Sequence, residues 1–164
     1  MSGPNPAGPN GPVPGFTLSN DHARLPYADI HRWLARESYW SANIPFDTLK
    51  RAIEHSVPFA IFEDATGRLA CFGRVITDHA TFAYVGDVFV LPEYRGRGLS
   101  KWLMEAMAAH PSLQGLRRWV LLTRDGHGLY ARTGYTPLQQ PERWMERRPI
   151  APYPPLAPEE ASGA

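Results

Sequence analysis

The sequence has one cysteine, no long apolar run and almost no net charge, and each absence excludes a class of protein. Cys71 has no second cysteine to pair with, so no internal disulfide can stabilise the fold. No apolar stretch approaches the roughly 20 residues that span a bilayer. A formal net charge of +1, with scattered arginines, gives no basic field for nucleic acid or an anionic membrane. Because no secretory signal pattern occurs either, the sequence predicts a cytoplasmic protein.

Residues that usually hold metals or act as nucleophiles are also poorly placed. The six histidines are dispersed, none pairs with a cysteine at ligand spacing, and no carboxylate cluster suits calcium. We therefore expect no metal site. No Gly-x-Ser-x-Gly elbow occurs, and Cys71 lies in an apolar, strand-like run, where we expect a small buried hydrophobic residue. Nucleophilic hydrolysis is therefore disfavoured.

Proline is concentrated at the two ends of the chain. Ten of the 17 prolines lie in residues 1–15 and 149–164, which carry no periodic apolar pattern. We expect both segments to be disordered or extended tails. Residues 16–148 are one domain's worth of sequence, and a hydrophobic content of 43% is enough for a packed core.

Apolar spacing within residues 16–148 alternates between the helical and the strand period. The expected order is strand, two helices, three strands, helix, strand, short helix and a weak last strand. The corresponding ranges are 16–19, 27–36, 46–55, 58–62, 69–77, 81–91, 98–109, 119–123, 127–133 and a stretch within 138–146. This order predicts a mixed α/β fold with an antiparallel hairpin core.

The most informative segment is residues 88–104, where a β-branched run breaks into a glycine turn and restarts as an apolar helix. Gly96 and Gly98 let a ligand approach the backbone closely, because no Cβ occupies that space. The first amides of the helix have no partner within it, and the helix dipole favours an anion beside them. Arg95 and Arg97 can add charge-assisted hydrogen bonds. The segment therefore predicts a phosphate site.

Two common phosphate-binding patterns do not fit this turn. No Gly-Lys-Ser/Thr closes a P-loop, and Lys101 stands where a Rossmann fingerprint needs its third glycine. Residues 95–100, Arg-Gly-Arg-Gly-Leu-Ser, instead resemble motif A of the GCN5-related N-acetyltransferases, in which Gln/Arg-x-x-Gly-x-Gly/Ala binds the pyrophosphate of acetyl-coenzyme A. Ser100 departs from this pattern, but serine is small enough to keep the backbone close.

A second segment resembles motif B of the same family. In that motif a tyrosine on a short helix precedes x-x-x-Gly-Phe/Tyr, and Tyr130 followed by Gly134-Tyr135 matches it. The resemblance implies the acyl-coenzyme A N-acyltransferase fold of α+β type, with a central mixed, mostly antiparallel sheet flanked by helices. It also implies that acetyl-coenzyme A is the acetyl donor. The expected cofactor-binding residues are Phe89, Val90, Arg95, Gly96, Arg97, Gly98, Leu99, Ser100 and Tyr130.

Acyl transfer from a thioester to an amine requires the amine to lose a proton and the departing thiolate to gain one. A tyrosine, with an ordinary pKa near 10, can donate to a thiolate whose thiol has a pKa of about 8.5. Tyr130 is the candidate acid, unless it only packs on the cofactor or core. The resemblance makes Asp87 the candidate base, the alternative being a carboxylate that binds nearby backbone. Strand alternation places Asp87 on the face of Phe89, opposite Val88 and Val90.

The connection between the first two helices, residues 37–42, offers walls for the acceptor. In the fold implied by the resemblance this connection lies over the acceptor cleft. Tyr39 and Trp40 could stack on an apolar or cationic amine, and Glu37 or Asp78 could attract its charge. For Trp40 the alternative is closure of the core beneath the helices. We expect Tyr39, Trp40 and Asp78 to bind the acceptor.

The resemblance and this chemistry together predict an acetyl-coenzyme A dependent N-acetyltransferase. The acceptor is expected to be a primary amine of a small molecule that attacks the thioester directly. Two alternatives stay open: a non-catalytic acyl-coenzyme A binding or interaction module, and a nucleotide-binding protein that uses the same turn. Neither nucleic acid nor a membrane is an expected partner, and pairing of two copies through the final strands is left open.

Overall fold

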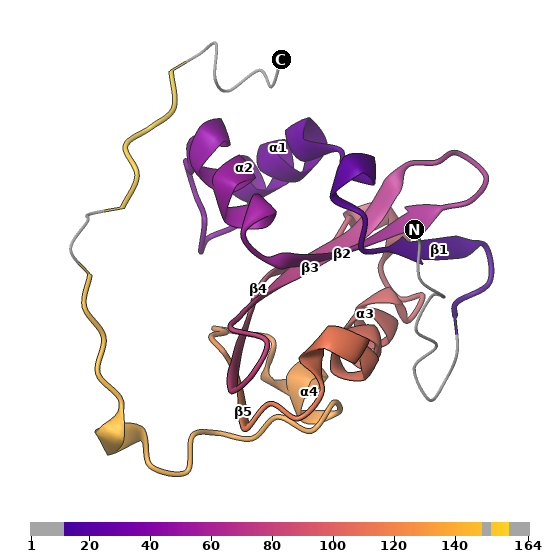
Figure 1. Ribbon diagram of the computed structural model, residues 1–164. Coiled ribbons are helices and arrows are strands. Elements are labelled where there is room, and N and C mark those ends of the chain that lie inside the picture. The colour runs from indigo at the N-terminus through magenta and orange to yellow at the C-terminus, as the bar shows by residue number, and fades with distance from the viewer. Residues whose placement is uncertain (1–11, 149–151, 158–164) are drawn as a thin grey trace.

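The chain folds around one sheet (Figure 1). The computed structural model describes residues 12–148 and 152–157. In this part of the chain five strands form a sheet in the order β1-β2-β3-β4-β5, antiparallel except that β5 runs parallel to β4. The strands are β1 (Phe16–Ser19), β2 (Val57–Glu63), β3 (Leu69–Thr77), β4 (Phe82–Val90) and β5 (Arg118–Leu121), and the helices are α1 (Tyr27–Glu37), α2 (Phe46–Glu54), α3 (Leu99–Ala109) and α4 (His127–Ala131). The expected mixed, mostly antiparallel sheet with flanking helices is confirmed.

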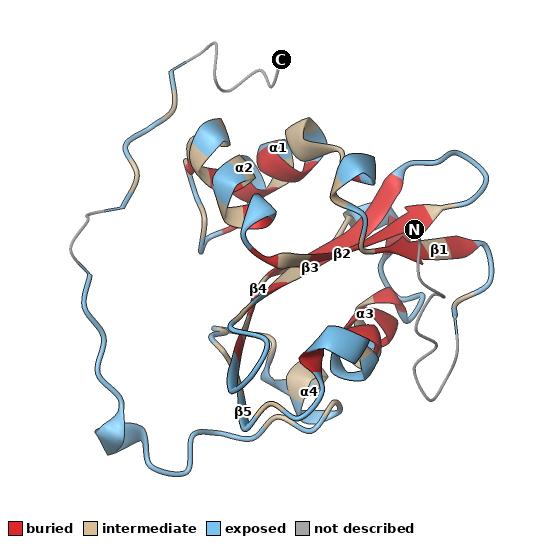
Figure 2. Ribbon diagram, in the orientation of Figure 1, coloured by how far each residue is buried: buried red, intermediate tan, exposed pale blue. Residues whose placement is uncertain are grey.

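Helices cover both faces of the sheet, and the inner surfaces of α1, α2 and α3 are buried (Figure 2). α1 and α2 lie on one face, whereas α3 and α4 lie on the other (Figure 1). α1 and α2 each carry an apolar stripe at helical spacing that packs against the sheet. The buried stripe residues are Ile30, Leu34, Leu49 and Ile53. Their burial fixes the connection between α1 and α2 above the sheet.

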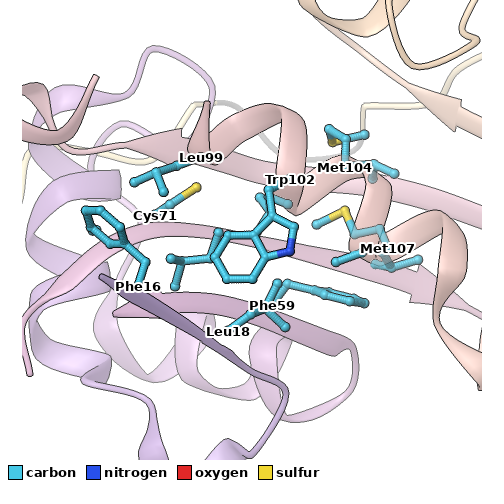
Figure 3. Close-up of a cluster of buried hydrophobic side chains, with 14 of the residues drawn as sticks. Phe16, Leu18, Phe59, Cys71, Leu99, Trp102, Met104 and Met107 are labelled. Atoms are coloured by element: carbon cyan, nitrogen blue, oxygen red, sulfur yellow. The ribbon is translucent and has the colours of Figure 1, made fainter. Parts of the chain in front are cut away.

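The core beneath α3 surrounds Trp102 (Figure 3). Cys71 is fully buried in this cluster, as expected, and burial raises the pKa of its thiol. α3 approaches β3 so closely that a Cβ on Gly73 would lie 2.8 Å from Met107 Cε and 3.0 Å from Leu103 Cδ2. Glycine at position 73 therefore allows the close packing that holds α3 behind the candidate site.

β4 and β5 separate halfway along β4. Their pairing ends at Val85 and Leu121, whereas β4 continues to Val90. β5 therefore stops before the expected end of its strand at residue 123. Beyond the last pair, the side of β4 that faces β5 has no strand partner in the described part of the chain. A gap between two strands thus opens toward the glycine turn.

The last expected strand, within residues 138–146, is wrong. This stretch contains a single 3-10 turn, Pro141–Arg143, and no β-strand. Pro141 has no amide hydrogen to donate to a sheet, and Met145 is 96% exposed, so neither backbone pairing nor burial holds the segment extended against β5. Alternation of apolar residues alone is therefore not enough to predict a strand in this stretch.

Most of the two expected tails lies outside the described residues. Residues 12–15 and 152–157 are the described parts of these tails, and they form no helix or strand. β1 begins directly after residue 15. Val13 packs against the core beneath α3, and Tyr153 and Leu156 pack against the core beneath α1 and α2. Among the helices of the described residues, none has the length and apolar character needed to cross a membrane.

Candidate functional site

A cleft of about 930 Å³ occupies the gap between the separated ends of β4 and β5. β4 forms its floor. The glycine turn lies at one side, and the α1–α2 connection and the loop from β5 to α4 form the other walls. The lining residues that the sequence predicted are Tyr39, Trp40, Asp87, Phe89, Val90, Arg95, Gly96, Gly98, Leu99, Ser100 and Tyr130. Segments distant in the sequence therefore converge on one cavity.

The glycine turn presents backbone to this cleft. Gly96 and Gly98 have φ values of 75° and 81°, in the left-handed region that favours glycine. A Cβ built on either residue would meet no atom within 4 Å, so the space beside the turn is open. α3 begins at Leu99 without a side-chain cap, which leaves its first amides free for an external acceptor. These features fit the pyrophosphate of a coenzyme A.

The two arginines of the turn differ in their surroundings. Arg95 lines the cleft, where its Nε donates to the Val90 carbonyl at 3.2 Å. The guanidinium of Arg97 instead lies over the rings of Tyr94 and Phe16, at 5.6 and 6.0 Å from their centroids. The structure therefore does not bring the Arg97 side chain to the cleft, because cation–π contacts hold it toward β1. Only the backbone of Arg97 remains in the turn.

Tyr130 lies on α4 at the opposite wall. Its ring packs so closely on Gly126 that a Cβ there would lie 2.9 Å from Tyr130 Cε2. The Tyr130 carbonyl accepts from the Tyr135 amide at 3.1 Å, and the two rings meet edge to face at 6.0 Å. Burial raises the pKa of Tyr130 to about 12. Its hydroxyl therefore stays protonated at neutral pH and is a hydrogen-bond donor.

Asp87 lies at a β-bulge, where it and Val88 stand opposite the single residue Gly73 of β3. Its φ of 56° is in the left-handed region. The bulge shifts the alternation of β4, so that Val85 and Val88 both point to the α3 side, while Asp87 shares the opposite face with Phe89. The predicted position of Asp87 on the same face as Phe89 is therefore confirmed. The bulge explains why Val85, two residues earlier, lies on the opposite face from Asp87.

The Asp87 carboxylate is buried and accepts three side-chain hydrogen bonds. Oδ1 accepts from Trp40 Nε1 at 3.0 Å and from Ser41 Oγ at 3.2 Å, and Oδ2 accepts from Arg74 Nε at 2.5 Å. Arg74 also donates to the Ala52 carbonyl in α2 at 3.4 Å. The carboxylate thus joins β3, β4 and the α1–α2 connection, which suits a positioning group better than a free base.

The aromatic wall of the cleft is shared between two loops. Tyr39 and Trp40 are each 43% exposed, so Trp40 does not close the core beneath the helices. Tyr39 Oη accepts from the Arg124 amide at 2.9 Å, and the Arg124 guanidinium lies 3.9 Å from the Tyr39 ring centroid. The α1–α2 connection and the β5–α4 loop therefore meet across the cleft.

Asp78 is not brought to this cavity. Its Oδ1 accepts from the amides of Ala80, Thr81 and Phe82, and its Oδ2 accepts from Thr81 Oγ1. These bonds hold the pKa of the Asp78 carboxyl well below its usual range. Asp78 closes the exposed turn between β3 and β4, so its expected contact with the acceptor is not supported.

Among the residues of the cleft that the sequence reasoning missed, Trp33 and Arg74 make the contacts that shape it. Trp33 lies in the helix that the sequence predicts over residues 27–36, and its ring stacks on Phe89 at 4.1 Å between centroids and lies 5.9 Å from the Trp40 ring. Arg74 was read as part of a strand. A lone arginine in an otherwise apolar run needs a buried partner of opposite charge, which the structure shows to be Asp87.

Comparisons with known proteins agree with this geometry. The model of the acetyltransferase (GNAT) family matches residues 27–135. A curated protein of Gibberella zeae, named as a candidate acetyltransferase, is 29% identical over 137 residues, which cover 71% of this chain and 76% of the relative. The crystal structure of a GNAT-family protein of Xanthomonas campestris pv. campestris, named likewise, is 52% identical and superposes with a TM-score of 0.80 over 86% of this chain and 96% of its own.

A glucosamine-6-phosphate N-acetyltransferase from Arabidopsis thaliana is more distant. It is 16% identical, with a TM-score of 0.53 over 82% of this chain and 99% of its own, and this likeness shows a common fold alone.

Proposed function

The chain belongs to the acetyltransferase (GNAT) family, and from this premise we propose that it transfers the acetyl group of acetyl-coenzyme A to a primary amine of a small molecule. The observation that carries the proposal is the cleft between β4 and β5. It has an uncapped glycine turn at one side and a protonated tyrosine hydroxyl at the other. A binding module needs the turn, whereas only a transferase needs the acid.

The turn and the floor of the cleft would hold the donor. Free amides at the start of α3 and the adjacent Arg95 suit the pyrophosphate, since both supply hydrogen-bond donors beside a positive helix end. Leu99 is buried in the core, so it contributes only its amide. The unpaired side of β4 at Phe89 and Val90 offers backbone groups to the amide-containing arm, in the manner of strand addition.

Bound acetyl-coenzyme A would supply a thioester whose carbonyl carbon the amine attacks directly. Tyr130 would donate its hydroxyl proton as the carbon–sulfur bond breaks, which leaves a neutral thiol. The attacking amine would release its proton to water, and the Tyr130 oxygen would recover a proton from water, so that the site returns to its starting state. The Tyr130 hydroxyl carries its proton at neutral pH, as a tyrosine with the ordinary pKa near 10 also would, so the proton is present when the thiolate forms. The closed contact between Tyr39 and Arg124 keeps the reacting end of the cleft between protein walls.

Asp87 would act here through its neighbours. Its three hydrogen bonds orient Trp40, Ser41 and Arg74, so it shapes the acceptor wall and does not take the amine proton itself. The aromatic rings of Trp33, Tyr39 and Trp40 favour an acceptor with an apolar or cationic body. A cavity of about 930 Å³ that also holds the end of the donor favours a small acceptor.

Calorimetric titration of acetyl-coenzyme A into the full chain, followed by thiol release with a panel of amines, tests the proposal. We expect saturable binding, and thiol release that depends on an amine. Binding without release by any amine would favour the non-catalytic module. Protection of the protein by ATP without any binding of coenzyme A would favour a nucleotide-binding protein, and either result would overturn the proposed activity.

A further inference from the structure

A cavity of about 650 Å³ lies beside α1, and we call it the arginine pocket. Because α1 forms one wall, the pocket is on the face of the sheet opposite α3 (Figure 1). Its apolar lining comes from the ends of three strands, and the residues are Phe62, Leu69 and Leu91. Its arginines come from three separate segments, and they are Arg24, Arg32, Arg36 and Arg68. No donor or acceptor contact described above involves these four arginines.

Two of these arginines form ion pairs with carboxylates that also line the pocket. Arg32 Nη1 lies 2.9 Å from Asp29 Oδ1, and Arg68 Nη2 lies 3.0 Å from Glu93 Oε1. All four side chains are about half exposed. Ion pairs this exposed contribute little to stability, and each guanidinium group keeps further donors that a bound anion can use.

The other two arginines have no carboxylate partner among the described residues. Arg24 and Arg36 make no ion pair or side-chain hydrogen bond there, and the Arg24 guanidinium lies 5.3 Å from the centroid of the Phe62 ring. The third carboxylate of the lining, Glu37, forms no ion pair with a described residue either. Because four arginines and three carboxylates line the pocket, it has an excess of positive charge. Guanidinium groups bind carboxylates and phosphates through paired hydrogen bonds.

The arginine pocket adjoins the cleft. Trp33 and Glu37 lie one helical turn apart on α1, and each of them lines both cavities. A molecule with its amine in the cleft can therefore extend along α1 into the pocket. The pyrophosphate of the donor would lie elsewhere, at the start of α3 on the other face of the sheet. This separation assigns an anion in the arginine pocket to the acceptor.

We propose that the arginine pocket is a second part of the acceptor site and binds an anionic group, a carboxylate or a phosphate, at the far end of the acceptor. The substrate class is then an amine that carries a negative charge remote from its amino group. Arg24 and Arg36 would donate hydrogen bonds to the anion, and the apolar lining would contact the chain that joins it to the amine. This inference rests on the proposed acetyl transfer and narrows its acceptor from small amines in general to one class.

Thiol-release kinetics with matched pairs of acceptors test this proposal. Each pair consists of an n-alkylamine and the ω-amino carboxylate or ω-amino phosphate of the same length, over a series of lengths. Once the chain spans from the cleft to the pocket, the anionic member should have a kcat/KM about 10-fold higher than the alkylamine. Arg36→Gln should lose most of this preference.

Arg51→Gln is the matched control. Arg51 is also an exposed arginine of a helix, α2, but it lines neither the cleft nor the arginine pocket. Its substitution changes the net charge by the same amount, and the preference for the anionic acceptor should remain. An equal loss in both variants would assign the preference to the overall charge of the protein and would overturn the subsite.

Two further outcomes separate this inference from the proposed function. Equal kcat/KM values within every pair would overturn the anionic subsite and leave acetyl transfer to amines standing. Absence of thiol release with every acceptor would overturn the proposed function itself, and the subsite with it.

The 3′-phosphate of coenzyme A is the other anion that could reach the pocket. Calorimetric titration of acetyl-coenzyme A and of its 3′-dephospho form into the natural chain and Arg36→Gln distinguishes the two sources. We expect the substitution to change both dissociation constants by the same factor. Weaker binding of acetyl-coenzyme A alone would assign the arginine pocket to the donor and would overturn the proposal.

Discussion

The two halves of the cleft are built in different ways. The donor half, residues 95–100, is one continuous segment that presents backbone, with left-handed glycines and an uncapped helix start. The acceptor half joins side chains from separate elements, and the Asp87 carboxylate links Trp40 and Arg74 across 47 and 13 residues of sequence. Backbone sites depend on local conformation, whereas side-chain networks depend on how the whole chain packs.

This difference has energetic consequences. A backbone site is lost when its local conformation or its open space is lost, and the rest of the fold need not respond. A buried ionic network also supports the packing around it, because removal of one partner leaves a charge without compensation. We therefore expect substitutions in the donor half to weaken binding with only a local cost of backbone strain, and substitutions in the acceptor half to lower binding and global stability together.

Tyr130 stands between the two halves, and its removal should have the largest effect. Tyr130→Phe keeps the ring and removes the proton donor, so kcat should fall by about 10²- to 10⁴-fold. The Kd for acetyl-coenzyme A should change little. Because burial raises the pKa of Tyr130 to about 12, the natural enzyme should show no alkaline loss of kcat from this group below about pH 11. Steady-state kinetics across pH measures both effects.

Tyr135→Phe is the matched control for this substitution. Tyr135 packs against Tyr130 and is partly buried like it, but it lines a separate hollow between α3, β5 and residues 132–145 and does not line the cleft. Its kcat should stay near that of the natural chain. Equal losses in both variants, or an unchanged kcat in Tyr130→Phe, would remove the acid role and leave a packing role.

Arg74→Met tests whether the acceptor half is a supporting network. Arg74 and Asp87 side chains are only 14% and 6% exposed, so loss of the arginine should lower the free energy of unfolding by about 3–5 kcal/mol. The KM for the amine should rise, while the Kd for acetyl-coenzyme A should stay the same. Urea denaturation and kinetics measure the two effects.

A double-mutant cycle with Asp87→Asn provides the control. Asparagine tolerates the left-handed conformation at this position and lacks the charge. The double variant should be more stable than the sum of the two single losses predicts. Each single variant leaves one buried charge without its partner, whereas the double variant leaves neither. Strictly additive losses would show that the two side chains do not interact, and the acceptor half would then not be a supporting network.

Gly98→Trp tests the donor half. The new side chain would enter the open space beside the turn, and we expect the Kd for acetyl-coenzyme A to rise at least about 100-fold, or ~2.7 kcal/mol. Gly67→Trp is the control, since Gly67 has a φ of 71° and open space in the turn between β2 and β3, far from the cleft. Both variants should share the strain of about 1–2 kcal/mol. Normal binding of acetyl-coenzyme A by Gly98→Trp would show that the donor does not bind at this turn.

The same division explains what the sequence could and could not predict. The order of elements and the glycine turn followed from apolar spacing and from the dihedral freedom of Gly96 and Gly98, which are local properties. The bonding of Arg74 and the surroundings of Arg97 depend on neighbours distant in the sequence. The final strand expected within residues 138–146 failed because apolar alternation does not reveal whether a segment is paired or buried, and here Pro141 lacks an amide hydrogen and Met145 is 96% exposed.

Asp78→Ala should have the smallest effect and marks the boundary of the acceptor half. Loss of its turn hydrogen bonds should lower the Tm slightly at pH 7, with no change in the KM for the amine. Because the pKa of Asp78 is lowered in the folded chain, its contribution is present above its ordinary pKa of 3.8 and is lost as the pH falls below that value. The Tm difference between the two proteins should therefore narrow in acid. A raised KM for the amine in this variant would show that Asp78 contributes to binding of the acceptor. The acceptor site would then extend from the cleft to the β3–β4 turn.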